Sequence, residues 1–338
     1  MSLQKKTISG LIWTFSQQFS VQIINFVVSI ILARLLMPEE FGLIAMITIF
    51  IGIGNVLIDN GLASSLIRTE KVDQRDLSTV FWVNVGASIV IYCVIFVCAP
   101  LIADFYRQPL LTALIRAYTI SFIINALAVV QSTLLSKEMN FRKQMLIQLP
   151  NVIICGTVGV VLAYNGYGVW TFVCMNVLSS ILNFAFHWFR SSWYPKFIFD
   201  RASFRKHFRF GYKLTLSGIL DQVFENLYVM VIGRLFSAGR LALYNRAYTL
   251  QMLPVQNISS ALMKVTFPLF AKIQHDDEKL RIAYKKILVL VFFFTVPIML
   301  SLQLSARPLV VLLFSDKWCI CISVVRLFHI LMVRLFEN

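Results

Sequence analysis

Long stretches without a charged residue are the dominant feature of this sequence. The longest, Gln144–Phe189, contains 46 residues and no Asp, Glu, Lys or Arg. A helix needs about 20 mainly apolar residues to cross the roughly 30 Å hydrocarbon layer of a membrane. Gln144–Phe189 is about twice that length, and the turn-rich segment Tyr164–Gly168 divides it into two spans. The chain is therefore predicted to be a helical membrane protein.

Composition supports an all-α integral membrane fold with about ten transmembrane helices. Charged residues are 14% of the 338 residues and the mean hydropathy is +0.76, whereas soluble domains carry roughly 25% charged residues. The expected spans are Thr7–Ala33, Phe41–Ile58, Leu77–Ala103, Ala117–Ser136, the two halves of Gln144–Phe189, Tyr212–Phe236, Ala247–Phe270, Ile287–Ala306 and Cys319–Phe336.

The net charge of +15 is concentrated in the connections between these spans. With the N-terminus inside, the N-terminal residues and the cytoplasmic connections hold 20 Lys and Arg residues, and the outer connections with their adjoining helix ends hold 8. Such an excess on one side is typical of cytoplasmic loops. We therefore expect a cytoplasmic N-terminus and no nucleic-acid partner.

A weak internal repeat predicts a two-lobe helical bundle. A shift of 200 residues aligns "ARLLMPEEFGL" at Ala33–Leu43 with "GRLFSAGRLAL" at Gly233–Leu243, as in transporters built from repeats. The expected domains are a six-helix lobe at 1–190, a basic cytoplasmic linker at 191–213 and a second lobe at 214–338. Because the second lobe has room for about two helices fewer, we expect it to be truncated at its C-terminal end.

No catalytic or cofactor motif is evident. The sequence has no P-loop, no metal-ligand spacing and no nucleophile motif. We therefore expect no enzyme activity, no cofactor and no metal.

A polar row follows one face of the first span. Gln18, Gln22 and Asn25, with Thr14 before them and Ser29 after, recur every three or four residues and so share a face of a helix. Such a row is unfavourable against lipid. It either forms hydrogen bonds to another helix or lines a wet cavity, and we assign it to a substrate pathway.

Three charged residues inside spans, and Arg116 at the start of the fourth span, complete the candidate pathway. Asp221 and Glu225 lie one turn apart in the seventh span, and Lys264 lies within the eighth. They either form a structural ion pair or bind a coupling cation, H⁺ or Na⁺. Arg116 either points into the cavity, where it would bind a phosphate oxygen, or reaches the outer interface.

Several segments resemble bacterial polysaccharide and O-antigen transporters. They are "LARLLMPEEFGLIAM" at Leu32–Met46, "APLIADFYRQPLL" at Ala99–Leu111, "YNGYGVW" at Tyr164–Trp170 and "LYNRAYTLQMLP" at Leu243–Pro254. The resemblance implies the lipid-linked oligosaccharide flippase branch of a superfamily that also contains multidrug exporters.

The resemblance also implies a function and partners. The chain would move an undecaprenyl-diphosphate-linked oligosaccharide across the bacterial inner membrane by alternating access, for lipopolysaccharide, O-antigen or exopolysaccharide synthesis. Membrane lipids and other proteins of polysaccharide assembly are the expected partners. The alternatives are a cation-coupled drug exporter of the same fold, a membrane polysaccharide polymerase or ligase, and an inactive fragment.

Overall fold

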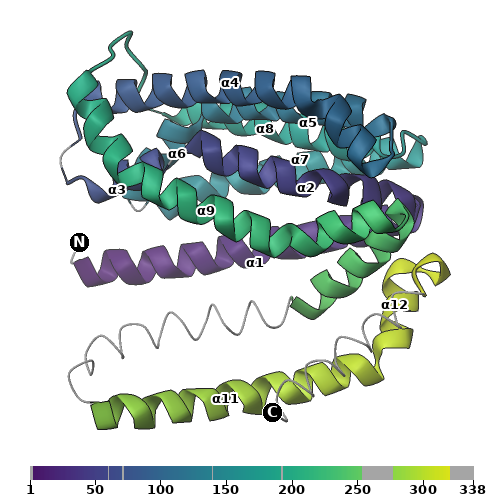
Figure 1. Ribbon diagram of the computed structural model, residues 1–338. Coiled ribbons are helices and arrows are strands. Elements are labelled where there is room, and N and C mark those ends of the chain that lie inside the picture. The colour runs from purple at the N-terminus through teal and green to yellow at the C-terminus, as the bar shows by residue number, and fades with distance from the viewer. Residues whose placement is uncertain are drawn as a thin grey trace. The chain divides into compact units, whose positions relative to one another are not determined.

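The computed structural model describes residues 3–59, 61–70, 72–138, 140–191, 193–252 and 277–319, and it is drawn in Figure 1. The described residues form helices and connecting loops, without strands, so the all-α prediction is confirmed. The helices are α1 (Leu3–Leu35), α2 (Pro38–Asp59), α3 (Leu62–Arg68), α4 (Gln74–Tyr106), α5 (Leu110–Ala126), α6 (Val129–Lys137), α7 (Phe141–Tyr164), α8 (Trp170–Arg190), α9 (Arg201–Leu235), a helical stretch at 238–252, α11 (Asp277–Leu304) and α12 (Ala306–Phe314).

Local sequence explains several helix ends. The side chain of Asn140 accepts a hydrogen bond from the backbone N–H of Lys143, and that of Asp200 accepts one from Ser203, so both residues cap the helices that follow them. Gly166 and Gly168 both adopt positive φ values. They form the predicted turn between α7 and α8, since glycine occupies this region without strain.

Among the described residues, five helices are long and apolar enough to cross a membrane: α1 over Ser16–Leu35, α2, α4, α7 and α8. Helices α5 and α6 make a sixth span if they are counted together, with a bend of 49° between them. These six spans agree with the predicted first lobe. The predicted fourth span, Ala117–Ser136, is therefore broken near Leu127, and its first helix already begins at Leu110.

Three further elements differ from the sequence predictions. The short helix α3 was not predicted. Helix α9 begins at Arg201, so only the first part of the predicted linker 191–213 is non-helical. The helix that was expected to begin at Ala247 begins at residue 238. It therefore includes the last part of the repeat segment Gly233–Leu243. Lys264 and the predicted tenth span lie outside the described residues.

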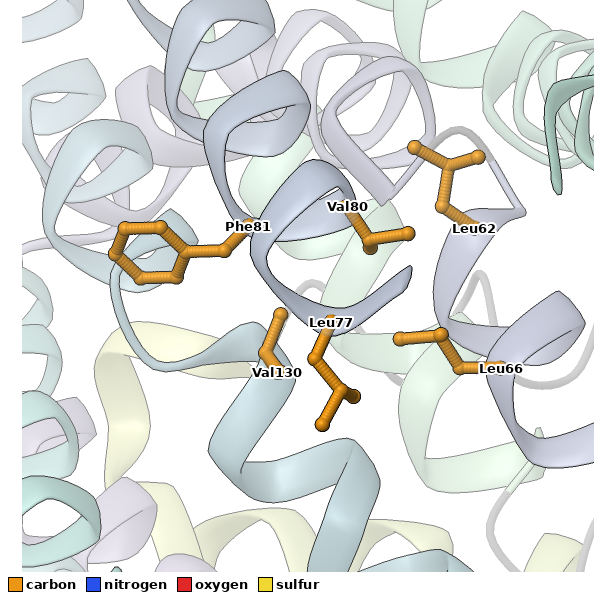
Figure 2. Close-up of a cluster of buried hydrophobic side chains, with 6 residues drawn as sticks. All are labelled: Leu62, Leu66, Leu77, Val80, Phe81 and Val130. Carbon is orange, nitrogen blue, oxygen red and sulfur yellow. The ribbon is translucent and has the colours of Figure 1, made fainter. Parts of the chain in front are cut away.

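The chain forms two compact units, residues 1–238 and 239–338. In the first unit α1 packs on α7, α7 and α5 pack on α8, and α9 packs against α2, α3 and α4. A buried apolar cluster joins α3, α4 and α6; its members, shown in Figure 2, are Leu62, Leu66, Leu77, Val80, Phe81 and Val130. The division into lobes at residues 190 and 213 remains a prediction, since packing in one conformation does not define what moves.

In the second unit, Arg246 lies over two aromatic rings. Its guanidinium carbon is 4.8 Å from the ring centre of Phe314 and 5.2 Å from that of Trp318. Trp318 is fully buried. These contacts join the helical stretch 238–252 to the end of α12 and the 3₁₀ turn Asp316–Trp318.

Candidate functional site

Two adjoining cavities in the first unit are lined mainly by uncharged polar side chains. One has a volume of about 400 Å³ and lies between α1 and α7; the other has about 380 Å³ and lies among α5, α6, α7 and α8. Both are lined by Gln17, Gln144 and Gln148. We call the two together the amide trough. Its other polar members are Gln18, Gln22, Asn25, Asn125, Ser132, Asn151, Asn176, Ser179, Ser180, Asn183 and His187.

Helical periodicity places these side chains on facing surfaces. On α7 the polar row is Gln144, Gln148 and Asn151, and on α8 it is Asn176, Ser180, Asn183 and His187. The spacings of four and three residues are the same as in the predicted row of α1, and such spacing keeps side chains on one face. Because α7 packs against both α1 and α8, the three rows meet in one region.

Hydrogen bonds hold parts of the trough in place. The amide of Gln17 donates to the side-chain oxygen of Gln148, which joins α1 to α7. The amide of Asn151 donates to the carbonyl of Ser179 at 3.1 Å, and that of Asn176 donates to the carbonyl of Tyr118 at 3.2 Å. These bonds use only part of the capacity of each amide, which has two donors and an acceptor with two lone pairs.

The trough has no formal charge within its described lining, which contains no Asp, Glu, Lys or Arg. Amides and hydroxyls can donate and accept hydrogen bonds without attracting an ion from the surrounding water. This chemistry suits a ligand with many hydroxyl groups better than it suits an inorganic ion or a purely apolar molecule.

The structure brings together some of the predicted pathway residues. Gln18, Gln22 and Asn25 line the trough. Arg116 of α5 instead packs against α4, where its guanidinium carbon is 4.2 Å from the ring centre of Phe96 and its Nε donates to the Phe96 carbonyl at 3.3 Å.

The remaining predicted residues lie elsewhere. Asp221 and Glu225 are exposed on α9, and neither has an ion-pair partner among the described residues. The rows of α7 and α8 were missed, although their spacing in the sequence is the same signal that identified the row of α1.

A second polar group lies at the end of the first unit where α1 begins, and it ties α9 to α3 and α4 (Figure 1). Asp76 of α4 lies 3.3 Å from Nε2 of His207 and 3.4 Å from Nζ of Lys206. The hydroxyl of Ser65 on α3 is hydrogen-bonded to Nδ1 of His207 at 2.8 Å. Ser65, Asp76 and His207 are all buried, so this group holds helices together and is closed to a substrate.

Comparison with known proteins identifies the family. Residues 31–323 match the family described as "Polysaccharide biosynthesis protein". The chain is a member of this polysaccharide biosynthesis family. One relative is the lipopolysaccharide biosynthesis protein WzxC of Escherichia coli K12, which is 32% identical to this chain over 333 residues. The alignment covers 97% of this chain and 67% of the relative. Another is the succinoglycan biosynthesis transport protein ExoT of Rhizobium meliloti, 26% identical over 87% of this chain and 60% of the relative.

A solved structure shares the fold of this family member. It is an inward-facing conformation of a multidrug resistance MATE family transporter of the MOP superfamily, with a TM-score of 0.65 and 17% sequence identity. The match covers 90% of this chain and 75% of that one. The polysaccharide biosynthesis protein therefore has the all-α fold of a multi-pass membrane transporter.

Proposed function

We propose that this protein is a flippase that moves a lipid-linked oligosaccharide across the bacterial inner membrane. The observation that carries the proposal is the amide trough, an uncharged polar cavity within a bundle of membrane-spanning helices. Membrane helices carry such rows of polar side chains mainly at helix contacts, cavities and transport pathways. A glycan supplies hydroxyl groups that match the free donors and acceptors of the trough.

The relatives support this cargo. WzxC is named for lipopolysaccharide biosynthesis and ExoT for transport in succinoglycan biosynthesis. A glycan carried on undecaprenyl diphosphate would be held by the trough, while its lipid tail would remain in the bilayer. Transfer of the tail through a polar cavity would cost about 0.8 kcal/mol for each CH₂ group. Alternating access would follow from one lobe rocking against the other.

The orientation follows from charge. Lys137 and Lys206 lie at the end of the first unit that holds Asp76, and α1 begins at the same end (Figure 1). Basic residues accumulate on the cytoplasmic side of inner-membrane proteins. The proposed N-terminus is therefore cytoplasmic, and the trough would receive its glycan from the inner leaflet.

A coupling cation and protein partners belong to the same proposal. Asp221 and Glu225, one turn apart on α9, would bind H⁺ or Na⁺, because two carboxylates repel each other unless a cation lies between them. Arg116 or Lys264 would balance the charge of the diphosphate, and Arg116 would first have to leave its contact with Phe96. Other proteins of polysaccharide assembly would supply and collect the lipid-linked glycan. No enzyme activity is part of this function.

The second candidate is a cation-coupled drug exporter, which the fold of the multidrug resistance transporter favours. The chemistry of the trough argues against it, since an apolar or cationic drug gains little from a cavity lined by amides and hydroxyls. If the protein were such an exporter, cells that lack it would become sensitive to cationic dyes, and their surface polysaccharide would be unchanged.

The direct test is accessibility of the lipid-linked glycan. In spheroplasts of the host bacterium, a membrane-impermeant reagent that oxidises and tags sugars labels only glycans on the outer leaflet. Deletion of the gene is expected to leave the lipid-linked oligosaccharide unlabelled and accumulated inside, and the full-length protein is expected to restore labelling. Equal labelling with and without the protein would refute the flippase.

A further inference from the structure

The first half of α9 carries three parallel rows of residues, each with a spacing of four. Ser203, His207 and Gly211 form the buried row that faces α3 and α4. The second row is aromatic, with Phe204, Phe208 and Tyr212. The third row is basic, with Arg205, Arg209 and Lys213, and all three of its residues are exposed.

The basic row has no internal counter-charge. Among the described residues, Arg205, Arg209 and Lys213 have no ion-pair partner. The nearby carboxylate of Asp76 contacts Lys206 and His207 instead. Like charges one helical turn apart repel and destabilise a helix. The three exposed cations are therefore available to bind an external anion.

The aromatic row beside it is a continuous stack. The ring centres of Phe204 and Phe208 are 5.2 Å apart, and those of Phe208 and Tyr212 are 6.1 Å apart, with an interplanar angle of 27° for both pairs. Phe208 is 43% exposed and Tyr212 is 45% exposed. Tyr212 completes this stack, and tyrosine is one of the residues enriched at the boundary between lipid headgroups and acyl chains.

The length of α9 is sufficient to place both rows at that boundary. Its 35 residues extend about 52 Å, whereas the hydrocarbon layer is about 30 Å thick. If the last 20 or so residues cross this layer, the first half of the helix lies in the headgroup region of the inner leaflet. The basic and aromatic rows then face phosphates and the upper acyl chains.

We propose that these two rows form a binding strip for anionic phospholipids of the inner leaflet. Arg205, Arg209 and Lys213 bind the headgroup phosphates, and Phe204, Phe208 and Tyr212 pack against the glycerol and upper acyl region. The buried row fixes the strip to α3 and α4, so that bound lipid also stabilises the junction between α9 and the rest of the first unit. This inference does not depend on the identity of the transported cargo.

The test measures lipid binding to the full chain. Native mass spectrometry of the detergent-solubilised protein gives dissociation constants for phosphatidylglycerol and for phosphatidylcholine. The triple variant R205Q/R209Q/K213Q is expected to bind phosphatidylglycerol about 100-fold more weakly, or about fivefold for each lost cation. Its binding of phosphatidylcholine is expected to change less than twofold. Circular dichroism shows whether the variant keeps its helices, and the single variant R209Q gives a fivefold test if the triple variant unfolds.

The matched control removes three exposed cations from α11. Arg281, Lys285 and Lys286 are exposed on α11 and lie outside the proposed strip, so R281Q/K285Q/K286Q is expected to weaken phosphatidylglycerol binding less than fivefold. Equal losses of phosphatidylglycerol affinity in the two triple variants would show that the effect comes from net charge alone, and would refute the proposed binding strip. Loss of undecaprenyl diphosphate binding with unchanged phosphatidylglycerol binding would overturn it as well, since the site would then belong to the cargo.

Discussion

Gln148 joins two polar rows of the amide trough, because it lines both cavities and accepts a hydrogen bond from Gln17 of α1. Gln148→Leu keeps the approximate size of the side chain and removes its hydrogen bonds. A neutral hydrogen bond contributes about 1 kcal/mol. The rate of glycan transfer into proteoliposomes at low substrate concentration is therefore expected to fall about fivefold.

Thr157 provides the control for this change. It lies on the same helix, is exposed, and donates only to the carbonyl of Ile153 within α7. Thr157→Val is expected to leave the transfer rate within twofold of the original. If Gln148→Leu behaves like Thr157→Val, the trough takes no part in glycan binding.

The residues of the site show what sequence can and cannot predict. The row of Gln18, Gln22 and Asn25 was visible because helical periodicity is a local property. The same spacing in α7 and α8 was equally visible, but its meaning depended on which helix faces meet. Arg116 could not be placed, because its long side chain can reach either the cavity or a neighbouring helix, and its partner Phe96 belongs to α4.

At the scale of elements, the junction of α9 with α3 and α4 depends on a buried histidine. His207 lies in the first half of α9, before the predicted seventh span at Tyr212–Phe236. Burial lowers the pKa of His207 below its usual value, although the neighbouring carboxylate of Asp76 favours the charged form. The folded protein therefore holds a neutral imidazole, hydrogen-bonded to Ser65.

This lowered pKa predicts a loss of stability in mild acid. Below the unfolded pKa of about 6.5, the unfolded chain takes up a proton that the folded chain does not, so the free energy of unfolding decreases as the pH falls. The melting temperature is expected to drop more between pH ~7.5 and pH ~5.5 in the original protein than in His207→Gln. Parallel curves for the two proteins would show that His207 does not control this dependence.

The same junction depends on close backbone contact. Gly61, just before α3, has a φ of +62°, and a Cβ atom there would lie 2.6 Å from the carbonyl oxygen of Gly211 on α9. Gly61→Ala combines this clash with left-handed strain of about 1–2 kcal/mol. Its melting temperature in detergent is expected to fall.

Gly86 in α4 is the matched control for Gly61. A Cβ atom on Gly86 would meet no atom within 4 Å, and alanine favours a helix over glycine by up to about 1 kcal/mol. Gly86→Ala is expected to keep or raise the melting temperature. A decrease of the same size in both variants would mean that the Gly61–Gly211 contact is not special.

The elements themselves were largely predictable. The uncharged runs identified α1, α2, α4, α7, α8 and α11, because exclusion of charge from the bilayer is a property of each segment alone. The bend between α5 and α6 was not predicted, since the sequence there has neither proline nor glycine and stays apolar. The start of α9 was missed because its first half is rich in basic residues, and a search for uncharged runs does not detect such a helix.

At the scale of the whole molecule, the sequence and the packing divide the chain differently. The internal repeat begins the second lobe near residue 214, whereas the compact first unit extends to Ala238 and includes α9. The difference matters for alternating access. If α9 moves with the second lobe, its contact with α2 must open in one of the states.

A disulfide between α2 and α9 would show whether the boundary between the two moving parts lies before or after α9. A Cβ atom on Gly218 would lie 3.9 Å from the Cβ of Val56, which is within the range of about 3.5–4.5 Å found in disulfides. The variant V56C/G218C, made after replacement of the six natural cysteines, is expected to cross-link and to lose glycan transfer, and a reductant is expected to restore it. Each single-cysteine variant controls for the substitutions themselves. Transfer that persists in the cross-linked protein would place the moving boundary after Ala238, because α2 and α9 would then travel together through the whole cycle.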